Sequence, residues 1–134
     1  MKDARIESLR LEFQPIARRW LHALVDDLGM KVRILETLRT PERQAEVQAA
    51  GRSQLKFGWH NVGLALDFAA FGDDGVYLID DRTGLYTRCG LVAEWMGCAW
   101  GGRWERLRDY GHIEWHPGMT LQQFLNGQKG GIVA

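Results

Sequence analysis

Residues 15–28 carry an apolar stripe at four-residue spacing. The stripe consists of Ile16, Trp20, Leu24 and Leu28, widened by Leu21 and Val25. This spacing predicts an amphipathic helix that packs against the core. Pro15 suits the first turn of such a helix, and Gly29 suits its C-terminal end.

Two later segments have the patterns of strands. Residues 31–38 alternate polar and apolar positions, and residues 64–71 form a nearly continuous apolar run. The first pattern predicts a half-buried strand and the second a buried strand. Between them, Thr40 suits the N-cap position and Pro41 the first position of a helix that we expect to reach about residue 50.

The segment after the buried strand begins with a strong turn signal at residues 72–75. We expect residues 76–80 to return as the second strand of a hairpin. Residues 85–96 then have a helical pattern. The apolar residues on one face of that helix are Leu91, Val92 and Trp95.

The last patterned segments are a short alternating strand at residues 112–115 and a short helix at residues 120–125. Together with the earlier elements they predict an α+β fold, in which helices flank a small antiparallel sheet. Residues 1–134 contain no internal repeat and no linker composition. We therefore expect a single domain without a separate cell-wall-binding domain.

Charge and composition exclude some classes of protein. The chain has 17 Lys and Arg against 17 Asp and Glu, so its formal net charge is zero. This balance argues against nucleic acid or an anionic membrane as the main partner. No segment approaches the roughly 20 apolar residues of a membrane helix. The first residues carry charges throughout and show no apolar signal core, so we do not expect export by the general secretion route. Cys89 and Cys98 lie too far apart along one predicted helix to form a disulfide.

The segment 58–68 contains the first candidate chemistry. Asp67 lies inside the buried strand, where an ionised carboxylate needs a partner. His60, seven positions earlier, offers a second ligand for a metal ion. A histidine from residues 112–116 would complete the two-histidine, one-carboxylate set of a catalytic zinc site. His112 is preferred to His116 because its strand buries it, whereas His116 precedes a Pro-Gly turn; the alternative is that a buried histidine here is a hydrogen-bonded core residue without metal.

Two other segments carry open alternatives. Arg39 falls at a strand-to-helix junction, where its side chain either points into a cleft or forms an ordinary salt bridge. The segment 100–104, WGGRW, is rich in glycine and tryptophan. Such a segment either lines a substrate groove or packs under a loop.

Two motifs resemble those of a known family. The first, S-x-H-x-x-G-x-A-x-D, is matched by His60, Gly63, Ala65 and Asp67; the second, D-x-x-H, is matched by Asp109 and His112. Together they resemble the zinc D-Ala-D-Ala carboxypeptidases and dipeptidases and the L-alanyl-D-glutamate endopeptidases. The similarity spans roughly residues 37–115, and the short chain looks most like globular phage endolysins.

The resemblance implies a fold of the hedgehog and D-Ala-D-Ala peptidase type and a zinc ion held by His60, Asp67 and His112. It implies that Asp109 is the general base, with Glu114 as the alternative. Arg39 would stabilise the oxyanion or bind a substrate carboxylate. The residues expected to contact substrate are Arg39, Gln44, Trp59 and Trp104.

Two positions depart from the family pattern. Gly58 stands where the family has a serine, and Gly111 stands where it commonly has a proline. The first departure removes a hydroxyl that is expected near the substrate. The aspartate at position 109, in contrast, resembles the L-alanyl-D-glutamate branch of the family.

The expected function is therefore zinc-dependent hydrolysis of the L-alanyl-D-glutamate bond in the peptide stem of peptidoglycan. The alternatives are a D-Ala-D-Ala carboxypeptidase, a zinc-bound wall-recognition domain without turnover, and a metal-free wall-binding protein. We expect a monomer that has no nucleic-acid partner and does not insert into a membrane. It would be made in a host cytoplasm without a signal peptide and act in the periplasm after phage-type release.

Overall fold

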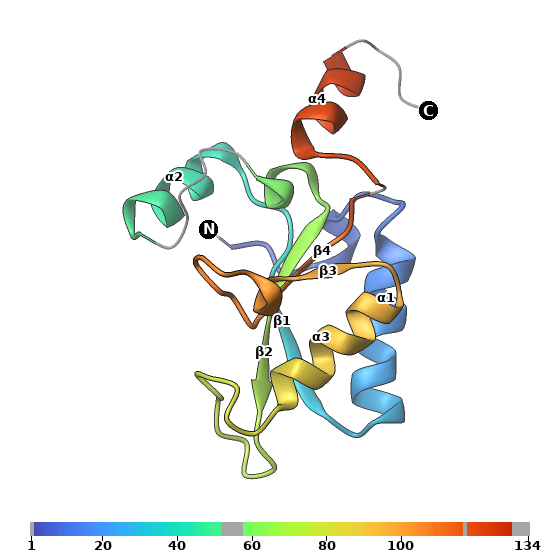
Figure 1. Cartoon of the computed structure of the whole chain (residues 1–134), viewed down its shortest axis with the longest axis vertical. Coiled ribbons are helices and arrows are strands. Elements are labelled where there is room, and N and C mark those ends of the chain that lie inside the picture. The colour runs from blue at the N-terminus through green and yellow to red at the C-terminus, as the bar shows by residue number, and fades with distance from the viewer. Residues whose placement is uncertain (1, 52–57, 117, 130–134) are drawn as a thin grey trace.

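The computed structural model describes residues 2–51, 58–116 and 118–129 (Figure 1). The α-helices are α1 (Gln14–His22), α2 (Pro41–Ala49), α3 (Leu85–Trp95) and α4 (Leu121–Lys129). The strands are β1 (Lys31–Glu36), β2 (Ala65–Phe71), β3 (Ala99–Trp100) and β4 (His112–Glu114). They form one antiparallel sheet in the order β1-β2-β4-β3. The predicted α+β class and antiparallel sheet are confirmed.

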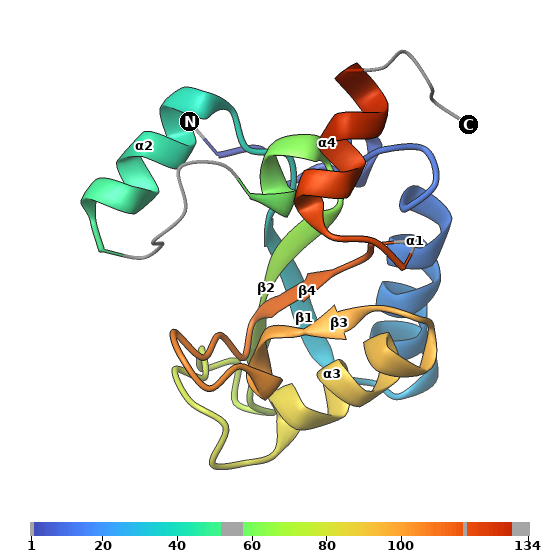
Figure 2. The same cartoon turned by 45° about the horizontal axis from the view of Figure 1, so that its top comes forward.

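The first helix packs against one face of the sheet through Trp20 and Leu24 of the predicted apolar stripe, whereas Val25 and Leu28 of that stripe are 38% and 50% exposed. Helix α1 continues as a π-helical turn, Ala23–Asp27, and Gly29 follows with a φ of 66°. The Trp20 ring meets the edge of Phe68 at 4.9 Å, and its indole N–H donates to the Cys89 carbonyl over 3.0 Å. Helices α1 and α3 therefore lie on the same side of the sheet, while α2 lies on the other side (Figures 1 and 2).

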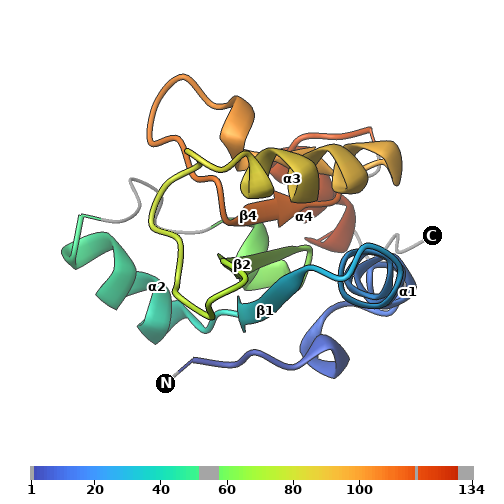
Figure 3. The same ribbon diagram turned by 90° about the horizontal axis from the view of Figure 1, so that it is seen from below.

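Strand β2 separates the core from the site. Leu66, Phe68 and Ala70 point into the cluster of buried apolar residues beneath α1 and α3. Successive side chains of a strand point to opposite faces, so Asp67 faces away from this core. Seen from below, the sheet runs between α1 on one side and α2 on the other (Figure 3).

The register of the sheet brings polar residues together on the face that carries Asp67. Asp67 is paired with His112 of β4 on one side and with Glu36 of β1 on the other. Ile34 is paired with Phe68, so the register shifts between Ile34 and Glu36. This bulge moves Glu36 from the core face to the face of Asp67, because directly opposed residues share a face.

The predicted strand at residues 76–80 is wrong. Gly72 N–H donates to the Val76 carbonyl and Leu78 N–H to the Ala70 carbonyl, but only one bridge forms, between Phe71 and Tyr77. The Tyr86 hydroxyl lies between the two segments, where it accepts from the Ala70 N–H over 3.1 Å and donates to the Leu78 carbonyl over 2.7 Å. The fourth strand is instead β3, which pairs with β4 at the edge of the sheet and whose two residues are too few to show a strand period.

Helix α3 confirms the helix predicted over residues 85–96, but its buried face differs from the apolar face seen in the sequence. Leu91 is 49% exposed and Trp95 86% exposed. The buried residues of α3 are Tyr86, Cys89, Gly90 and Ala93. Gly90 is needed for close packing, because a Cβ there would lie 2.1 Å from the Trp100 ring. Cys89 and Cys98 are both buried and free, as expected.

The remaining helices agree with their predicted signals. The Thr40 side chain accepts a hydrogen bond from the Arg43 N–H over 3.1 Å, so Thr40 caps α2. Helix α4 includes most of the helix predicted near residues 120–125. Among the described residues, none of the helices has the length and apolar content needed to cross a bilayer.

Candidate metal centre and active site

His60 is fixed by hydrogen bonds on both ring nitrogens. It lies in the 3₁₀ turn Trp59–Val62, directly before β2. Its Nδ1 lies 2.8 Å from the Thr37 carbonyl oxygen, which only accepts, so Nδ1 carries the proton. Its Nε2 lies 3.1 Å from Asp67 Oδ1. The nitrogen that faces Asp67 is therefore the one with the free lone pair when the ring is neutral.

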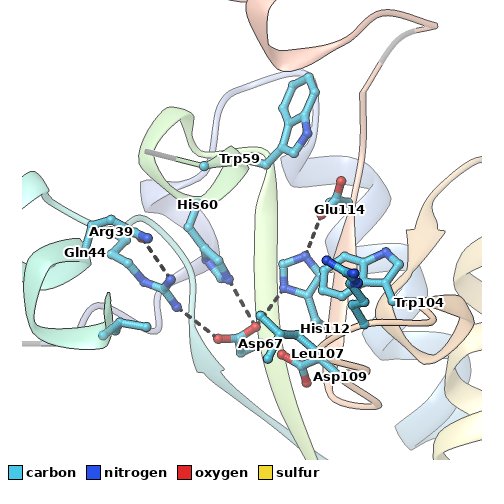
Figure 4. A pocket seen from close by; sticks show the side chains of 13 residues that line it. Arg39, Gln44, Trp59, His60, Asp67, Trp104, Leu107, Asp109, His112 and Glu114 are labelled. Carbon is cyan, nitrogen blue, oxygen red and sulfur yellow. Dashed lines mark hydrogen bonds and ion pairs between the residues drawn. The ribbon is translucent and has the colours of Figure 1, made fainter. Parts of the chain in front are cut away.

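His112 approaches the same carboxylate oxygen from the neighbouring strand. Its Nδ1 lies 3.0 Å from Asp67 Oδ1, and its Nε2 lies 2.7 Å from Glu114 Oε1. The two imidazoles thus converge on Asp67 Oδ1 (Figure 4). One ligand atom from each of His60, Asp67 and His112 lies within 4.8 Å of the other two.

His60, Asp67 and His112 are held together by a proton that a metal ion could replace. Burial disfavours the charged forms, yet the hydrogen bonds to Asp67 and Glu114 raise the pKa of His112 to about 10. Burial likewise opposes ionisation of Asp67, but His60 and His112 hold its pKa well below its usual range. The proton on His112 therefore balances the negative charge of Asp67. A metal cation bound between these side chains would balance the same charge in place of that proton.

The donor set fits zinc. Two imidazole nitrogens and one carboxylate oxygen are the ligand types of a catalytic zinc site with an open position. The outward nitrogen of each imidazole is held by an acceptor, Thr37 O or Glu114, as is usual for metal-binding histidines. Glu114 also lies 3.2 Å from His116 Nε2 through its second oxygen. These contacts suit Glu114 to orienting His112, and His116 lies outside the converging group.

The other side of Asp67 is held by a buried ion network. Arg39 Nη2 donates to Asp67 Oδ2 over 3.2 Å and to Glu36 Oε1 over 2.9 Å, and its Nη1 donates to Gln44 over 3.1 Å. Glu36 also accepts from Arg43 Nε over 3.0 Å. Of the two alternatives for Arg39, the salt bridge is the one that forms, with Glu36 and Asp67, and the side chain also lines the cavity beside Asp67. Glu36 was not predicted, because the bulge that turns it toward Asp67 has no sequence signal.

Asp109 comes from the loop between the Trp100 segment and β4. The Gly101 carbonyl accepts from both the Trp104 and the Asp109 N–H groups, at 3.2 and 3.1 Å, so the loop closes on itself. Asp109 Oδ1 accepts from the Gly111 N–H over 3.1 Å. Burial and then the charge of Asp67 raise the pKa of Asp109 above its usual value. A perturbed carboxyl in a cleft beside a metal-type donor set is typical of an acid or base.

A cavity of about 350 Å³ joins these groups (Figure 4). Its wall includes every site residue predicted from the sequence: Arg39, Gln44, Trp59, His60, Asp67, Trp104, Asp109 and His112. Trp104 packs on His112 with ring centroids 4.9 Å apart. The WGGRW segment thus lines the cavity with Trp104, while its Trp100 is buried. Val47, Arg106 and Leu107 also line the cavity and had no motif to reveal them.

A second cavity of about 240 Å³ adjoins the first at two aspartates. It shares Asp67 and Asp109 with the first cavity. The rest of its wall comes from the 77–79 segment, Tyr86, Leu35, Phe68 and residues 108–111. The two cavities therefore meet at one pair of carboxylates.

The fold and the site together define a metallopeptidase of the zinc type. A family model described as D-alanyl-D-alanine carboxypeptidase matches residues 51–115. The chain is also 32% identical over 113 residues to the peptidoglycan L-alanyl-D-glutamate endopeptidase CwlK of Bacillus subtilis (strain 168), covering 72% of this chain and 68% of that protein. The chain belongs to this peptidase family, M15, and the resemblance noted in the sequence is confirmed.

A second relative comes from a phage. The L-alanyl-D-glutamate peptidase of Listeria phage A118 is 37% identical over 92 residues, which are 66% of this chain. This chain spans only 31% of the phage protein's length. The similarity therefore concerns one part of that relative.

Two solved structures share the fold. The L-Ala D-Glu endopeptidase ChiX of Serratia marcescens has a TM-score of 0.69 at 21% identity, over 92% of this chain and 93% of ChiX. The E175A mutant of the D,D-pentapeptidase VanY, in complex with Zn(II), has a TM-score of 0.55 at 19% identity, over 88% of this chain and 84% of that one. These likenesses confirm the predicted fold type.

Proposed function

We propose that the chain is a zinc-dependent peptidoglycan peptidase that hydrolyses the L-alanyl-D-glutamate bond of the peptide stem. The observation that carries this proposal is the convergence of His60 and His112 on Asp67 Oδ1, with Asp109 on the wall of the same cavity. The names of the curated relatives support the choice of bond. Peptidoglycan is accordingly the proposed partner.

In this proposal His60, Asp67 and His112 hold the zinc ion. When bound, zinc supplies a Lewis acid that polarises a carbonyl and lowers the pKa of a water to about 7. Glu114 and the Thr37 carbonyl keep the two imidazoles in the tautomers that present a lone pair to the centre. Arg39 holds the second oxygen of Asp67 and so fixes the orientation of that carboxylate.

Asp109 acts as general base and then as general acid. It accepts the proton of the attacking water and returns it to the amine that leaves. Its raised pKa suits this role, because a carboxylate with a higher pKa is a stronger base toward the water and can still return the proton to the more basic leaving amine. Gly111 N–H holds one carboxylate oxygen of Asp109, leaving the other for the water.

The two cavities favour an endopeptidase over a carboxypeptidase. An endopeptidase must accommodate substrate on both sides of the bond that it cuts, whereas a carboxypeptidase needs only a small terminal subsite on one side. Here cavities of about 350 and 240 Å³ meet at Asp67 and Asp109. Trp59, Trp104, Gln44 and Arg39 line the first cavity and are the proposed substrate contacts there.

The identity of the new chain ends after digestion tests this function. Purified sacculi are incubated with the zinc-loaded protein, and newly exposed amino groups are labelled. Labelled D-glutamate is the expected result. Release of free D-alanine alone would assign the carboxypeptidase activity instead, and retention of zinc without any new amino group would indicate a recognition domain. A sample treated with chelator provides the blank.

We further propose that the protein works as a single-domain monomer that reaches the periplasm after phage-type release. The phage relative supports this route. Light scattering of the zinc-loaded protein tests the monomer. For the route, lysis of cells producing the protein should require co-expression of a membrane-permeabilising protein.

A further inference from the structure

The second cavity lies beside the proposed catalytic carboxylate and carries an arginine. Asp109 and Asp67 form its border with the first cavity, and Arg108 lines its wall together with Tyr77, Ile79 and Tyr110. We propose that this cavity receives the acidic residue on the amine side of the cut bond, and that Arg108 determines specificity by binding the carboxylate of that residue. This inference rests on the proposed function and names its second subsite.

The Arg108 guanidinium is held in place through Nε, while its two Nη atoms can still donate hydrogen bonds. Its Nε donates to the Trp104 carbonyl over 3.1 Å, across the closed loop. Within the described residues no carboxylate pairs with its guanidinium, whereas Arg39, Arg43 and Arg103 each bind a glutamate. The Nη atoms are therefore available for a two-pronged contact with a carboxylate, which is the geometry that arginine favours.

An acidic substrate needs such a cation at this position. The two aspartates that border the cavity repel a carboxylate that approaches them. The positive charge of Arg39 is already taken by Glu36 and Asp67, which lie 2.9 and 3.2 Å from its Nη2. Arg108 precedes Asp109 directly in the chain, so it places a compensating charge next to the proposed base.

The first cavity has a different character. Trp59, Trp104, Leu107 and Val47 give it apolar walls, which suit the alanine side of the bond. Arg106 also lines the first cavity and lies two positions before Arg108 in the chain. Within the described residues it has no carboxylate partner. Arg106 therefore serves as a matched control that has the same charge on the same loop but lies on the other cavity.

The test compares two substrates that differ in one group. They are L-alanyl-γ-D-glutamyl-L-lysine and its counterpart in which the glutamate α-carboxylate is an amide. We expect the wild type to prefer the acid, and Arg108→Ala to lower kcat/KM on the acid about 10- to 100-fold while changing it little on the amide. Arg108→Lys should retain part of the preference. Arg106→Ala should affect both substrates equally, and Arg19→Ala, on the exposed face of α1, should affect neither.

Binding of the amine-side product separates this inference from the proposed function. Titration calorimetry with γ-D-glutamyl-L-lysine and its α-amide should show tighter binding of the acid to the wild type, and equal binding of both to Arg108→Ala. If the acid binds no tighter than the amide, or if Arg108→Ala keeps the preference, the assignment of Arg108 is wrong. A preference that depends on Arg108, without cleavage of either substrate, would support the subsite while overturning the proposed function.

Discussion

The two halves of the site are held in place by different means. On the sheet side, Asp67 is surrounded by His60, His112 and Arg39, all within 3.2 Å of its oxygens, and strand pairing fixes its backbone on both sides. On the loop side, the Asp109 side chain accepts one hydrogen bond from the described residues, from the Gly111 N–H. Its backbone is positioned by two close approaches at glycines instead.

The glycines show how tight the loop side is. A Cβ on Gly101 would lie 2.4 Å from the Asp109 carbonyl oxygen, and a Cβ on Gly111 would lie 2.4 Å from the Phe68 carbonyl oxygen. The sheet side thus relies on charge and hydrogen bonds, and the loop side relies on backbone contact. The proposed metal ligands and the proposed base should therefore respond separately to mutation.

Replacing Asp67 should have the largest effect. Asp67→Asn removes the charge that both imidazoles face, so zinc binding and activity should be lost together. For the wild type, zinc at about 1,000 times its Kd stabilises the fold by about 4 kcal/mol, which corresponds to a Tm shift of roughly 15 °C. The variant should show no difference between zinc and chelator. Elemental analysis and thermal melting measure both effects.

The matched control is Asp73→Asn, an exposed aspartate in the turn after β2. It should keep zinc, activity and the Tm shift. A wild-type Tm that is unchanged by chelator would argue against a metal site built from these three residues.

Asp109→Asn should lower kcat by about 100- to 10,000-fold, because it removes the proposed general base. Zinc content should not change, since Asp109 belongs to the loop side. Asp109 is exposed and accepts a hydrogen bond from the Gly111 N–H, which an asparagine oxygen can also accept. In chelator the variant should therefore melt close to the wild-type Tm at pH 7. Loss of zinc in this variant would show that the two halves are not independent.

Glu36→Gln should weaken the sheet side in a pH-dependent way. Burial opposes ionisation of Glu36, but Arg39 and Arg43 lower its pKa below the usual 4.5. A lowered pKa gives stability that is present above pH 4.5 and is lost as the pH falls through the folded-state pKa. The variant should lose about 1–3 kcal/mol at pH 7, because Arg39 and Arg43 each lose one charged partner while Arg39 keeps Asp67 and Arg43 keeps Glu46. The gap from the wild type should close below pH 4.5 in thermal melts.

Glu94→Gln is the control for this comparison. Arg103 also lowers the pKa of Glu94, through contacts of 2.9 Å, but the arginine side chain is 60% exposed. An exposed pair contributes about 1 kcal/mol or less. An equal loss in both variants would mean that burial does not strengthen the Glu36 network.

On the sheet side, the sequence reveals the proposed metal ligands but not Glu36, which supports them. The continuous apolar run predicts β2, and a carboxylate inside that run, with a histidine seven positions earlier, points to Asp67 and His60. Glu36 escapes this reasoning because simple alternation places it on the face of Ile34. The bulge between these residues reverses that assignment, and a bulge depends on pairing partners far away in the sequence.

On the loop side, the sequence reveals the proposed base but not which cavity its neighbours line. The motif that contains Asp109 and His112 was visible, but nothing local indicated that Arg106 and Arg108 line different cavities. The mistaken strand at residues 76–80 and the exposed Trp95 have a similar cause. In each case a tertiary contact, to Tyr86 or between Gly90 and Trp100, outweighs the local pattern.

Gly101→Ala tests the steric half of the comparison and should have the smallest of these effects. The added Cβ would meet the Asp109 carbonyl oxygen at 2.4 Å and His112 Cβ at 3.2 Å, so the loop must shift. We expect a loss of about 1–3 kcal/mol in stability, as for other overpacked sites, and roughly a 10-fold loss of kcat. Gly72→Ala is matched to it, because its Cβ would meet the flexible end of Asp74 at 2.9 Å and backbone no nearer than the Val76 carbonyl oxygen at 4.0 Å. Zinc affinity should fall much less than kcat in Gly101→Ala; equal losses would mean that the loop also holds the metal ligands in place.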